Sequence, residues 1–368
     1  MKANRMWMCF VVSLGLLAPA TWGLSLCSYQ SPETLLMDAR TSFSYQYYDD
    51  ANTPAIDVST GRVDFSFSRL RDTAIYGSVV RLNGNVGLTN FLPSRWMGEG
   101  EASFRYYVSK ELPLFGFGGI HGITTTGQTQ LGLDIQSGFG FGRFKDVTPL
   151  AKAMVIHQNL RASNAISKPL SDDVVMKIGQ TIGSLSVVNP VENIVVMIES
   201  LVETVIDGQL DARSLLMIED VVMGSDPQRF CGFSAQAGLG YELLDPFGGP
   251  QGFLVALSAD AAYAPDQNGQ MQGHLGFSGP FDIANENTLT GTFSYEILIT
   301  KSSSLDAGYT FQRVQTVNLA PTTSHGISCN VVFKVASIDV LVGLSYTRST
   351  GDPGWSVGCS ISASMDLL

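Results

Sequence analysis

The sequence predicts an all-β transmembrane antiparallel barrel of about 14 strands, within a range of roughly 12 to 16, interrupted by an internal α-helical insert. Three observations predict this fold. Apolar and polar residues alternate along most of the chain, the alternating segments reach about 10 to 14 residues, and the connections between them are alternately short and long. A strand with two different faces has this period of two, and a tilted strand needs about 9–11 residues to cross a bilayer.

The composition is that of a folded, acidic protein with few charges. Of its 368 residues 45% are hydrophobic and only 15% are charged, against about 25% in an average soluble domain. Its 33 acidic and 22 basic residues give a net charge of −11. Binding to a phosphate backbone needs a concentrated basic surface, so we expect no nucleic-acid partner.

Residues 1–23 have the pattern of a secretory signal peptide. The positive charges of Lys2 and Arg5 precede an apolar run from Met6 to Leu17, and the small-residue sequence Ala18-Pro19-Ala20 follows. The run is too short to cross a bilayer as a helix, and no later segment has 18 uncharged apolar residues. We therefore expect export and no transmembrane helix.

Residues 24–145 are predicted to form the first six strands. In the segment 62–68 the apolar residues Val63, Phe65 and Phe67 alternate with polar ones, and the same alternation recurs before and after it. The six predicted strands are 39–49, 61–70, 73–89, 98–109, 114–124 and 130–143.

The alternation stops in the predicted insert, residues 146–229. Thr148-Pro149 and Asn189-Pro190 have the pattern of a helix N-cap followed by proline, and helices are also expected at 173–185 and 211–223. Because the insert follows an even number of strands, we expect it on the periplasmic side. Three roles stay open for it: a small self-contained bundle, a plug of the barrel, or a module that docks a partner.

Residues 230–368 are predicted to form the remaining eight strands. The last strand alternates apolar residues such as Trp355 and Ile361 with serines. Aromatic residues lie near strand ends on the apolar face, as in the girdles at membrane interfaces. The predicted strands are 230–243, 252–263, 270–279, 288–300, 304–316, 324–335, 338–348 and 354–367.

A soluble antiparallel sandwich also shows alternation, with its apolar face turned inward. Its solvated face would carry more Lys and Glu than the Gly, Ser, Thr, Asn and Gln found here. The connections also differ between the two ends of the predicted strands. Those after odd-numbered strands are expected to be long loops, for example 50–61 and 90–97, and those after even-numbered strands short turns, for example 71–72. Short turns at one rim and longer loops at the other are typical of a membrane barrel.

With these features the chain resembles the bacterial outer-membrane β-barrel proteins over roughly 39–145 and 230–368. Its strand number is similar to that of the pores and hydrophobic-compound transporters of about 14 strands in that class. It differs from them in ending in Leu367-Leu368 instead of an aromatic residue, and in the internal position of its extra domain. The resemblance implies location in the bacterial outer membrane and contact with outer-membrane lipid.

The charged side chains on the polar face are the candidate functional residues, because they would line the lumen of the barrel. Acidic residues outnumber basic ones among them, which would favour cations in a water-filled pore. An alternative stays open, in which opposite charges on neighbouring strands pair and only stiffen the wall. The candidate pore-lining residues are Arg62, Asp64, Arg81, Glu101, Arg105, Asp134, Glu242, Asp260, Glu296 and Lys334.

The sequence contains no nucleotide-binding, metal-binding or nucleophile motif, so we expect no enzyme, cofactor or metal site. The four histidines are widely separated and lack ligand spacing. One catalytic alternative remains, because His121, His325 and Ser137 share the parity of the lipid face, where a serine and a histidine would have to meet. A histidine in an interfacial girdle is the simpler interpretation.

The cysteines predict no CxxC-type metal or redox site. Four remain after export, and they allow three disulfide pairings between which the sequence does not choose. A lipid anchor on the first of them is a competing interpretation, although the bulky Leu26 precedes it. The four are Cys27, Cys231, Cys329 and Cys359.

The predicted function is the passage of small solutes through an outer-membrane pore, which would be gated if the insert plugs the barrel. The alternative is a non-transporting anchor whose acidic insert, 146–229, docks a periplasmic or envelope protein. Residues 146–228 carry 11 acidic and 5 basic side chains, a net charge of −6. A soluble secreted sandwich is the third hypothesis.

Overall fold

A computed structural model describes most of the chain and divides it into two compact units. The predicted signal peptide 1–23 and the predicted cap Asn189-Pro190 lie outside the described residues. The helical unit contains Val147–Arg229, Ala264–Gln267 and the described residues up to Tyr29, and the barrel unit contains the rest. The described residues are 24–30, 33–48, 58–109, 112–184, 191–206, 208–224, 228–249, 251–300, 302–335 and 338–366.

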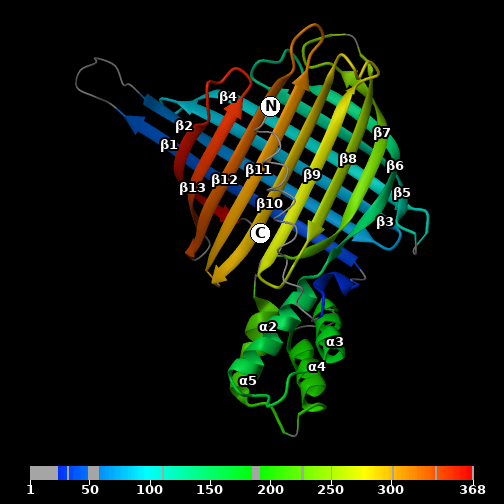
Figure 1. Cartoon of the computed structure of the whole chain (residues 1–368), viewed down its shortest axis with the longest axis vertical. Coiled ribbons are helices and arrows are strands. Elements are labelled where there is room, and N and C mark those ends of the chain that lie inside the picture. Colours follow the sequence, from blue (N-terminus) through cyan, green and yellow to red (C-terminus); the bar gives the residue numbers. More distant parts are fainter. Residues whose placement is uncertain are drawn as a thin grey trace, which may run out of the picture. The chain divides into compact units, whose positions relative to one another are not determined.

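The barrel unit is a closed antiparallel sheet of 14 strands across the described ranges, as the sequence predicts. Each strand pairs with its neighbours in chain order, and β1 closes the barrel on β14 (Figure 1). The strands are 11 to 16 residues long, which is enough to cross a bilayer at a tilt. They are β1 (Glu33–Tyr48), β2 (Val58–Thr73), β3 (Tyr76–Thr89), β4 (Leu92–Tyr107), β5 (Leu114–Thr125), β6 (Gly132–Asp146), β7 (Phe230–Leu244), β8 (Phe253–Tyr263), β9 (Gly269–Pro280), β10 (Asn287–Thr300), β11 (Ser303–Gln315), β12 (Thr322–Val335), β13 (Ile338–Ser349) and β14 (Ser356–Asp366).

The outer face of the barrel is apolar. The register places Ile120, Ile135 and Tyr241 in one row across β5, β6 and β7. Large apolar side chains on this face are exposed, and Phe139 and Ile361 reach exposed fractions of 75% and 77%. Leaving such surface in water costs about 25 cal/mol per Å², whereas hydrocarbon accommodates it. The soluble-sandwich hypothesis is wrong, because the strands form one closed sheet and not two packed sheets.

The predicted long loop at 90–97 is also wrong. Only Asn90 and Phe91 separate β3 from β4, and their φ angles are +50° and +62°. Two consecutive residues in the left-handed region form the tight hairpin turn whose twist matches that of the flanking strands. The proline of this stretch, Pro93, pairs with Leu88 inside the ladder, where a register shift accommodates it.

The helical unit is built around four helices within the described residues, α2 (Thr148–Ala162), α3 (Asp172–Gly183), α4 (Val191–Glu203) and α5 (Ala212–Met223). Each helix packs on the next, and α5 also packs on α2. None of the described helices has the length and hydropathy needed to span a bilayer. The fully buried side chains of this unit include Leu150, Ile156, Ile178, Ile194, Ile198 and Ile218.

Side chains of the same unit join the two ends of the insert and hold both ends of α5. The predicted cap Thr148 is the first residue of α2 and not its cap, and its hydroxyl accepts the Arg229 N–H at 2.9 Å, which joins the two ends of the insert. Asp211 caps α5, where its carboxylate accepts the Ser214 N–H at 2.9 Å. At the other end of α5, the Lys152 ammonium donates to carbonyl oxygens of the last turn, which suits the helix dipole.

The cysteines fall into two kinds. Cys27 and Cys231 are disulfide-bonded, so a lipid anchor on the Cys27 sulfur is excluded. Cys329 and Cys359 are free and exposed. The register places both of them on the outer face, where Leu344 lies between them.

Candidate pore lining

A row of charged residues crosses five adjacent strands on the inner face of the barrel. Arg81 of β3 lies opposite Glu101 of β4, which lies opposite His121 of β5. The row continues through Asp134 of β6 to Glu242 of β7. Directly opposed residues of an antiparallel pair share a face, so these side chains lie together. The other predicted residues have the same inner parity: Arg62, Asp64, Arg105, Asp260, Glu296 and Lys334.

His121 lies between two carboxylates in this row. Its Nδ1 is 2.9 Å from Asp134 Oδ2, and its Nε2 is 3.0 Å from Glu99 Oε1. An ionised carboxylate only accepts hydrogen bonds, so this geometry fits an imidazolium that donates from both nitrogens. The predicted lipid-face parity of His121 is therefore wrong.

Part of the charge is paired within the wall. Arg81 Nη1 lies 3.0 Å from Glu101 Oε2, and Arg62 Nε lies 2.6 Å from Asp64 Oδ1. The Arg62 and Arg81 side chains nevertheless keep exposed fractions of 58% and 47%. Exposed pairs of this kind contribute only about 0–1 kcal/mol, so the pairing is weak and leaves these charges exposed on the inner face.

Two other predicted acidic residues, Glu242 and Glu296, lie opposite acidic side chains of a neighbouring strand. The register sets Glu242 opposite Asp134, and Glu296 opposite Asp306. Like charges directly opposite each other on neighbouring strands repel, and they add to the negative potential of the inner face. Lys334, by contrast, lies opposite Asp339. Asp260 accepts a hydrogen bond from a second inner-face histidine, His274, at 2.7 Å.

Arg105 differs from the other candidates because it is buried, with an exposed fraction of 7%. Its guanidinium carbon lies 5.1 Å from the centre of the Phe115 ring, and its Nη1 donates to Ser234 Oγ at 3.4 Å. Phe115 and its neighbour Phe117 are buried as well. Arg105 therefore belongs to a packed cluster and not to the exposed part of the inner wall.

The same cluster contains an acid, a tyrosine and a second arginine. The Tyr107 hydroxyl donates to Asp72 Oδ2 at 2.9 Å, and the Arg143 guanidinium carbon lies 4.0 Å from the centre of the Tyr107 ring. We call these residues the inner cluster: Asp72, Arg105, Tyr107, Phe115, Phe117 and Arg143. Within the described residues, Asp72 Oδ1, Arg105 Nε and Arg143 Nε are buried without a hydrogen-bond partner.

Glycines on the adjoining strands make room for the aromatic rings of the inner cluster. A Cβ atom at Gly140 would lie 2.2 Å from Phe115 Cζ, and one at Gly238 would lie 2.8 Å from Phe117 Cζ. The glycine-rich stretch of β6 thus allows close packing of the strands and the aromatic rings. Phe115 and Phe117 were not predicted as inner residues because apolar side chains normally mark the outer face.

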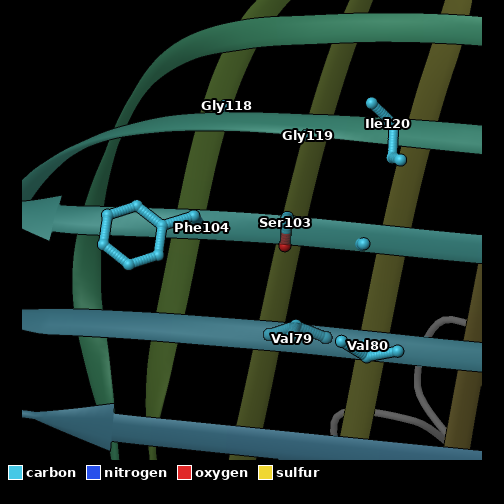
Figure 2. Close-up of a pocket in the computed structure, with 8 residues that line it drawn as sticks. Val79, Val80, Ser103, Phe104, Gly118, Gly119 and Ile120 are labelled. Carbon is cyan, nitrogen blue, oxygen red and sulfur yellow. The ribbon is translucent and has the colours of Figure 1, made fainter.

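A shallow hollow of about 380 Å³ lies in the wall of β3, β4 and β5. Figure 2 shows Phe104 and Ile120 beside the backbone of Gly118 and Gly119, which carry no side chains. The outer-face members of its lining are apolar or glycine, so this hollow faces lipid and offers no polar group for recognition.

The catalytic alternative is wrong for the pair Ser137 and His121, because the two residues lie on opposite faces of the sheet. Ser137 lies opposite Gly118 on the outer face, whereas His121 is on the inner face. His325 does lie on the outer face, where its Nδ1 is 2.9 Å from the Tyr309 hydroxyl and its ring is near Trp355. This is the environment of an interfacial girdle. Among the described residues, no three His, Cys, Asp or Glu side chains are grouped as metal ligands.

A closed barrel of 14 antiparallel strands, with an apolar outer belt and a charged inner face, defines an outer-membrane β-barrel protein. The apolar side chains face the hydrocarbon of the bilayer and the polar side chains face inward. The closed ladder pairs the backbone groups of neighbouring strands and leaves no strand edge in hydrocarbon.

Comparison with known proteins finds similar structures but no sequence family. No family model and no curated protein matches the chain. The CymD monoaromatic hydrocarbon channel is 11% identical, with 93% of this chain and 90% of that chain covered and a TM-score of 0.31. A BenF-like porin from Pseudomonas fluorescens Pf-5 is 8% identical, with 92% and 98% covered and a TM-score of 0.35. The Acinetobacter baumannii outer membrane protein Omp33 is 9% identical, with 91% and 99% covered and a TM-score of 0.35. The fold assignment rests on the strand register of this chain and not on these similarities.

Proposed function

We propose that the barrel conducts small solutes across the outer membrane and prefers cations. The observation that carries this proposal is the charged inner row from Arg81 to Glu242, in which the Arg81 side chain keeps an exposed fraction of 47% on the inner side of a closed sheet. Over the described strands, the register gives the outer face no comparable charged row. The inner row is therefore the part of the molecule suited to handling hydrophilic solutes.

The size of the barrel supports a modest channel. Barrels of about 8 strands are filled by their own side chains, whereas barrels of about 16–18 strands leave an aqueous channel. The 14 strands observed here lie between these limits. Acidic residues exceed basic ones on the inner face, and a narrow lumen of one sign concentrates the opposite ion.

Planar-bilayer recordings test this function. Purified protein should give discrete conductance steps, and a KCl gradient should give a reversal potential of the sign expected for cation preference. Replacing the adjacent carboxylates in D134N/E242Q should lower the cation preference. The matched substitution D220N on α5 removes an acidic charge outside the barrel and should leave it unchanged. Folded protein that never conducts would contradict the proposal.

A second candidate function is docking of an envelope protein by the helical unit. Val196 and Met197 of α4 are exposed beside a groove of about 620 Å³ between α3 and α4. Exposed apolar side chains beside a groove are a common feature of interaction surfaces. The net charge of −6 on residues 146–228 would favour a partner with a basic surface.

Replacing residues 150–226 by a short flexible linker separates the roles of the insert. A plug would predict a clear rise in conductance, because the obstruction is removed. A docking module predicts unchanged conductance and ion preference. The intact barrel of the deletion variant is verified by heat-modifiable gel migration before recording.

A further inference from the structure

At the rim of short turns, two strand ends are each paired with only one neighbouring strand among the described residues. The pairing of β1 with β14 begins at Arg40, so Glu33–Ala39 pair with β2 alone among the described strands. The pairing of β6 with β5 ends at Phe141, and the Gly142 N–H still donates to the Pro113 carbonyl at 2.8 Å. Among the described strands, Arg143–Asp146 then pair with β7 alone. At Gly142 the φ angle is +118°, a conformation that favours glycine, at the point where the β5–β6 ladder ends.

These two strand ends contact each other although β1 and β6 are not neighbours in the sheet. Their Cα atoms approach within 8 Å. Thr34 Oγ1 accepts the Asp146 N–H at 3.0 Å and donates to the Phe144 carbonyl at 3.5 Å. A second connection comes from Arg143 Nη2, which donates to the Ala74 carbonyl in the β2–β3 turn at 3.2 Å.

The inner cluster adjoins this contact, because Asp72 lies opposite Thr34 and Arg143 packs on the Tyr107 ring. Asp72, Tyr107 and Arg105 lie on the inner parity of β2 and β4 and have exposed fractions of 6%, 3% and 7%. Ser234 of β7 is only 1% exposed, although it also has inner parity. On the same wall, nearer the other rim, Arg81 remains half exposed. The inner face is thus open at the level of the charged row and closed at the level of the inner cluster.

We propose that the contact between β1 and β6 is a latch that closes part of the lumen with the barrel's own wall. Its parts are the Thr34 hydroxyl and the Arg143 guanidinium, and the inner cluster is the obstruction that they hold in place. Release of the latch lets the two strand ends separate and opens the inner cluster to the lumen. The proposal concerns regulation of the pore and so rests on the proposed function.

The latch also has a defined connection to the rest of the chain. Asp146, whose N–H is held by Thr34, is the last residue of β6 and is followed directly by the helical segment that begins at Val147. The buried, unpartnered Nε atoms of Arg105 and Arg143 make the closed arrangement costly, which suits an element with two states.

Cysteine accessibility tests the latch independently of transport. In a C329S/C359S background, S234C reports on the closed region and N83C reports on the exposed inner wall. A water-soluble maleimide should label S234C slowly in the parent barrel and at least tenfold faster when T34V or R143Q is added. N83C should label rapidly in every background.

Matched controls use the same residue types on the outer face. T41V on β1 and R69Q on β2 remove a threonine hydroxyl and an arginine charge, and they should leave S234C labelling slow. Each variant is verified as folded by heat-modifiable migration. The two latch variants are independent, so the loss of one to misfolding leaves the other decisive.

Conductance recordings of the same variants separate the latch from the proposed function. Faster S234C labelling together with raised conductance in T34V or R143Q is the expected result. Unchanged labelling in both variants would overturn the latch, whether or not the barrel conducts. Faster labelling without any conductance would sustain the latch and overturn the channel.

Discussion

At the scale of single residues, His121 is the clearest example of an inner side chain that offsets part of the negative charge of the inner face. It lies between Glu99 and Asp134 and hydrogen-bonds to both carboxylates. The predicted position of His121 on the outer face rested on the assumption that apolar side chains of a strand face lipid, and β5 departs from this assumption. Phe115 and Phe117 are apolar yet inner, so counting from them puts His121 on the wrong face, whereas counting from Ile120 puts it on the right one.

Replacing His121 should change ion preference. H121Q removes the cation held between two carboxylates, so the potassium-to-chloride permeability ratio should rise about twofold. Reversal potentials in a KCl gradient measure it. The matched variant H325Q changes a histidine of the outer face and should have no effect, and an equal shift in both variants would contradict the inner position of His121.

The close packing of the Phe115 ring on Gly140 predicts that a larger residue at position 140 destabilises the barrel. G140A places a methyl group into the ring and into the Ala235 carbonyl, which lies 2.9 Å from the ideal Cβ position. The free energy of unfolding should fall by about 1–3 kcal/mol, as in other overpacked interiors. G127A, where nothing lies within 4 Å of the added Cβ, is the control. Urea unfolding in lipid vesicles measures both, and equal stability would refute the packing.

At the scale of elements, the strands were predictable and the helix ends only in part. Alternation located all 14 strands because lipid on one side and water on the other impose the period of two. It missed Glu33–Asp38 at the start of β1, which pair with β2 alone among the described residues. The predicted helices at 173–185 and 211–223 match α3 and α5 closely. Thr148 was mistaken for a cap because its hydroxyl bonds across the insert to the Arg229 N–H, a contact far away in sequence.

The N-cap of α5 predicts a variant with a matched rescue. Hydrogen bonds from the Ser214 side chain and from the Ser214 N–H hold the pKa of the Asp211 carboxyl below its usual range. D211A should lower the melting temperature of the helical signal, and D211S should restore most of it, because serine also caps. The contribution of Asp211 is present above its unfolded pKa and is lost as the pH falls through the lowered folded value. A D211A protein as stable as the parent at pH 7 would contradict the cap.

His157 predicts a second pH effect in the helical unit. Burial and the nearby Arg161 lower the pKa of His157 from its usual 6.5, and its Nε2 accepts the Leu170 N–H. Because the unfolded chain binds the proton more readily, stability is complete above that usual value and falls as the pH decreases toward the lowered folded value. Melting of the helical circular-dichroism signal at pH 7.5 and 5 should show a larger drop in the parent than in H157Q. Equal drops would show that His157 does not titrate between the two pH values.

At the scale of the whole molecule, the barrel follows from one physical requirement, whereas its interior does not. A chain that crosses hydrocarbon without a spanning helix must hydrogen-bond every backbone group, and a sheet achieves this only when it is closed. The alternation of apolar and polar residues follows from the two different faces of that closed sheet. The inner cluster depends on contacts between β1, β2, β4, β5 and β6, which no local pattern encodes. The candidate lining was therefore predictable as a face, but the burial of Arg105 within it was not.

The central claim is that polar side chains line the inside of the barrel and apolar ones face lipid. Labelling of single cysteines along β10 in lipid vesicles tests it most directly, in the C329S/C359S background. The account predicts that T292C and S294C react with a water-soluble maleimide, while F293C and Y295C react only with a lipid-soluble one. Equal reactivity at all four positions, or the reverse alternation, would contradict it.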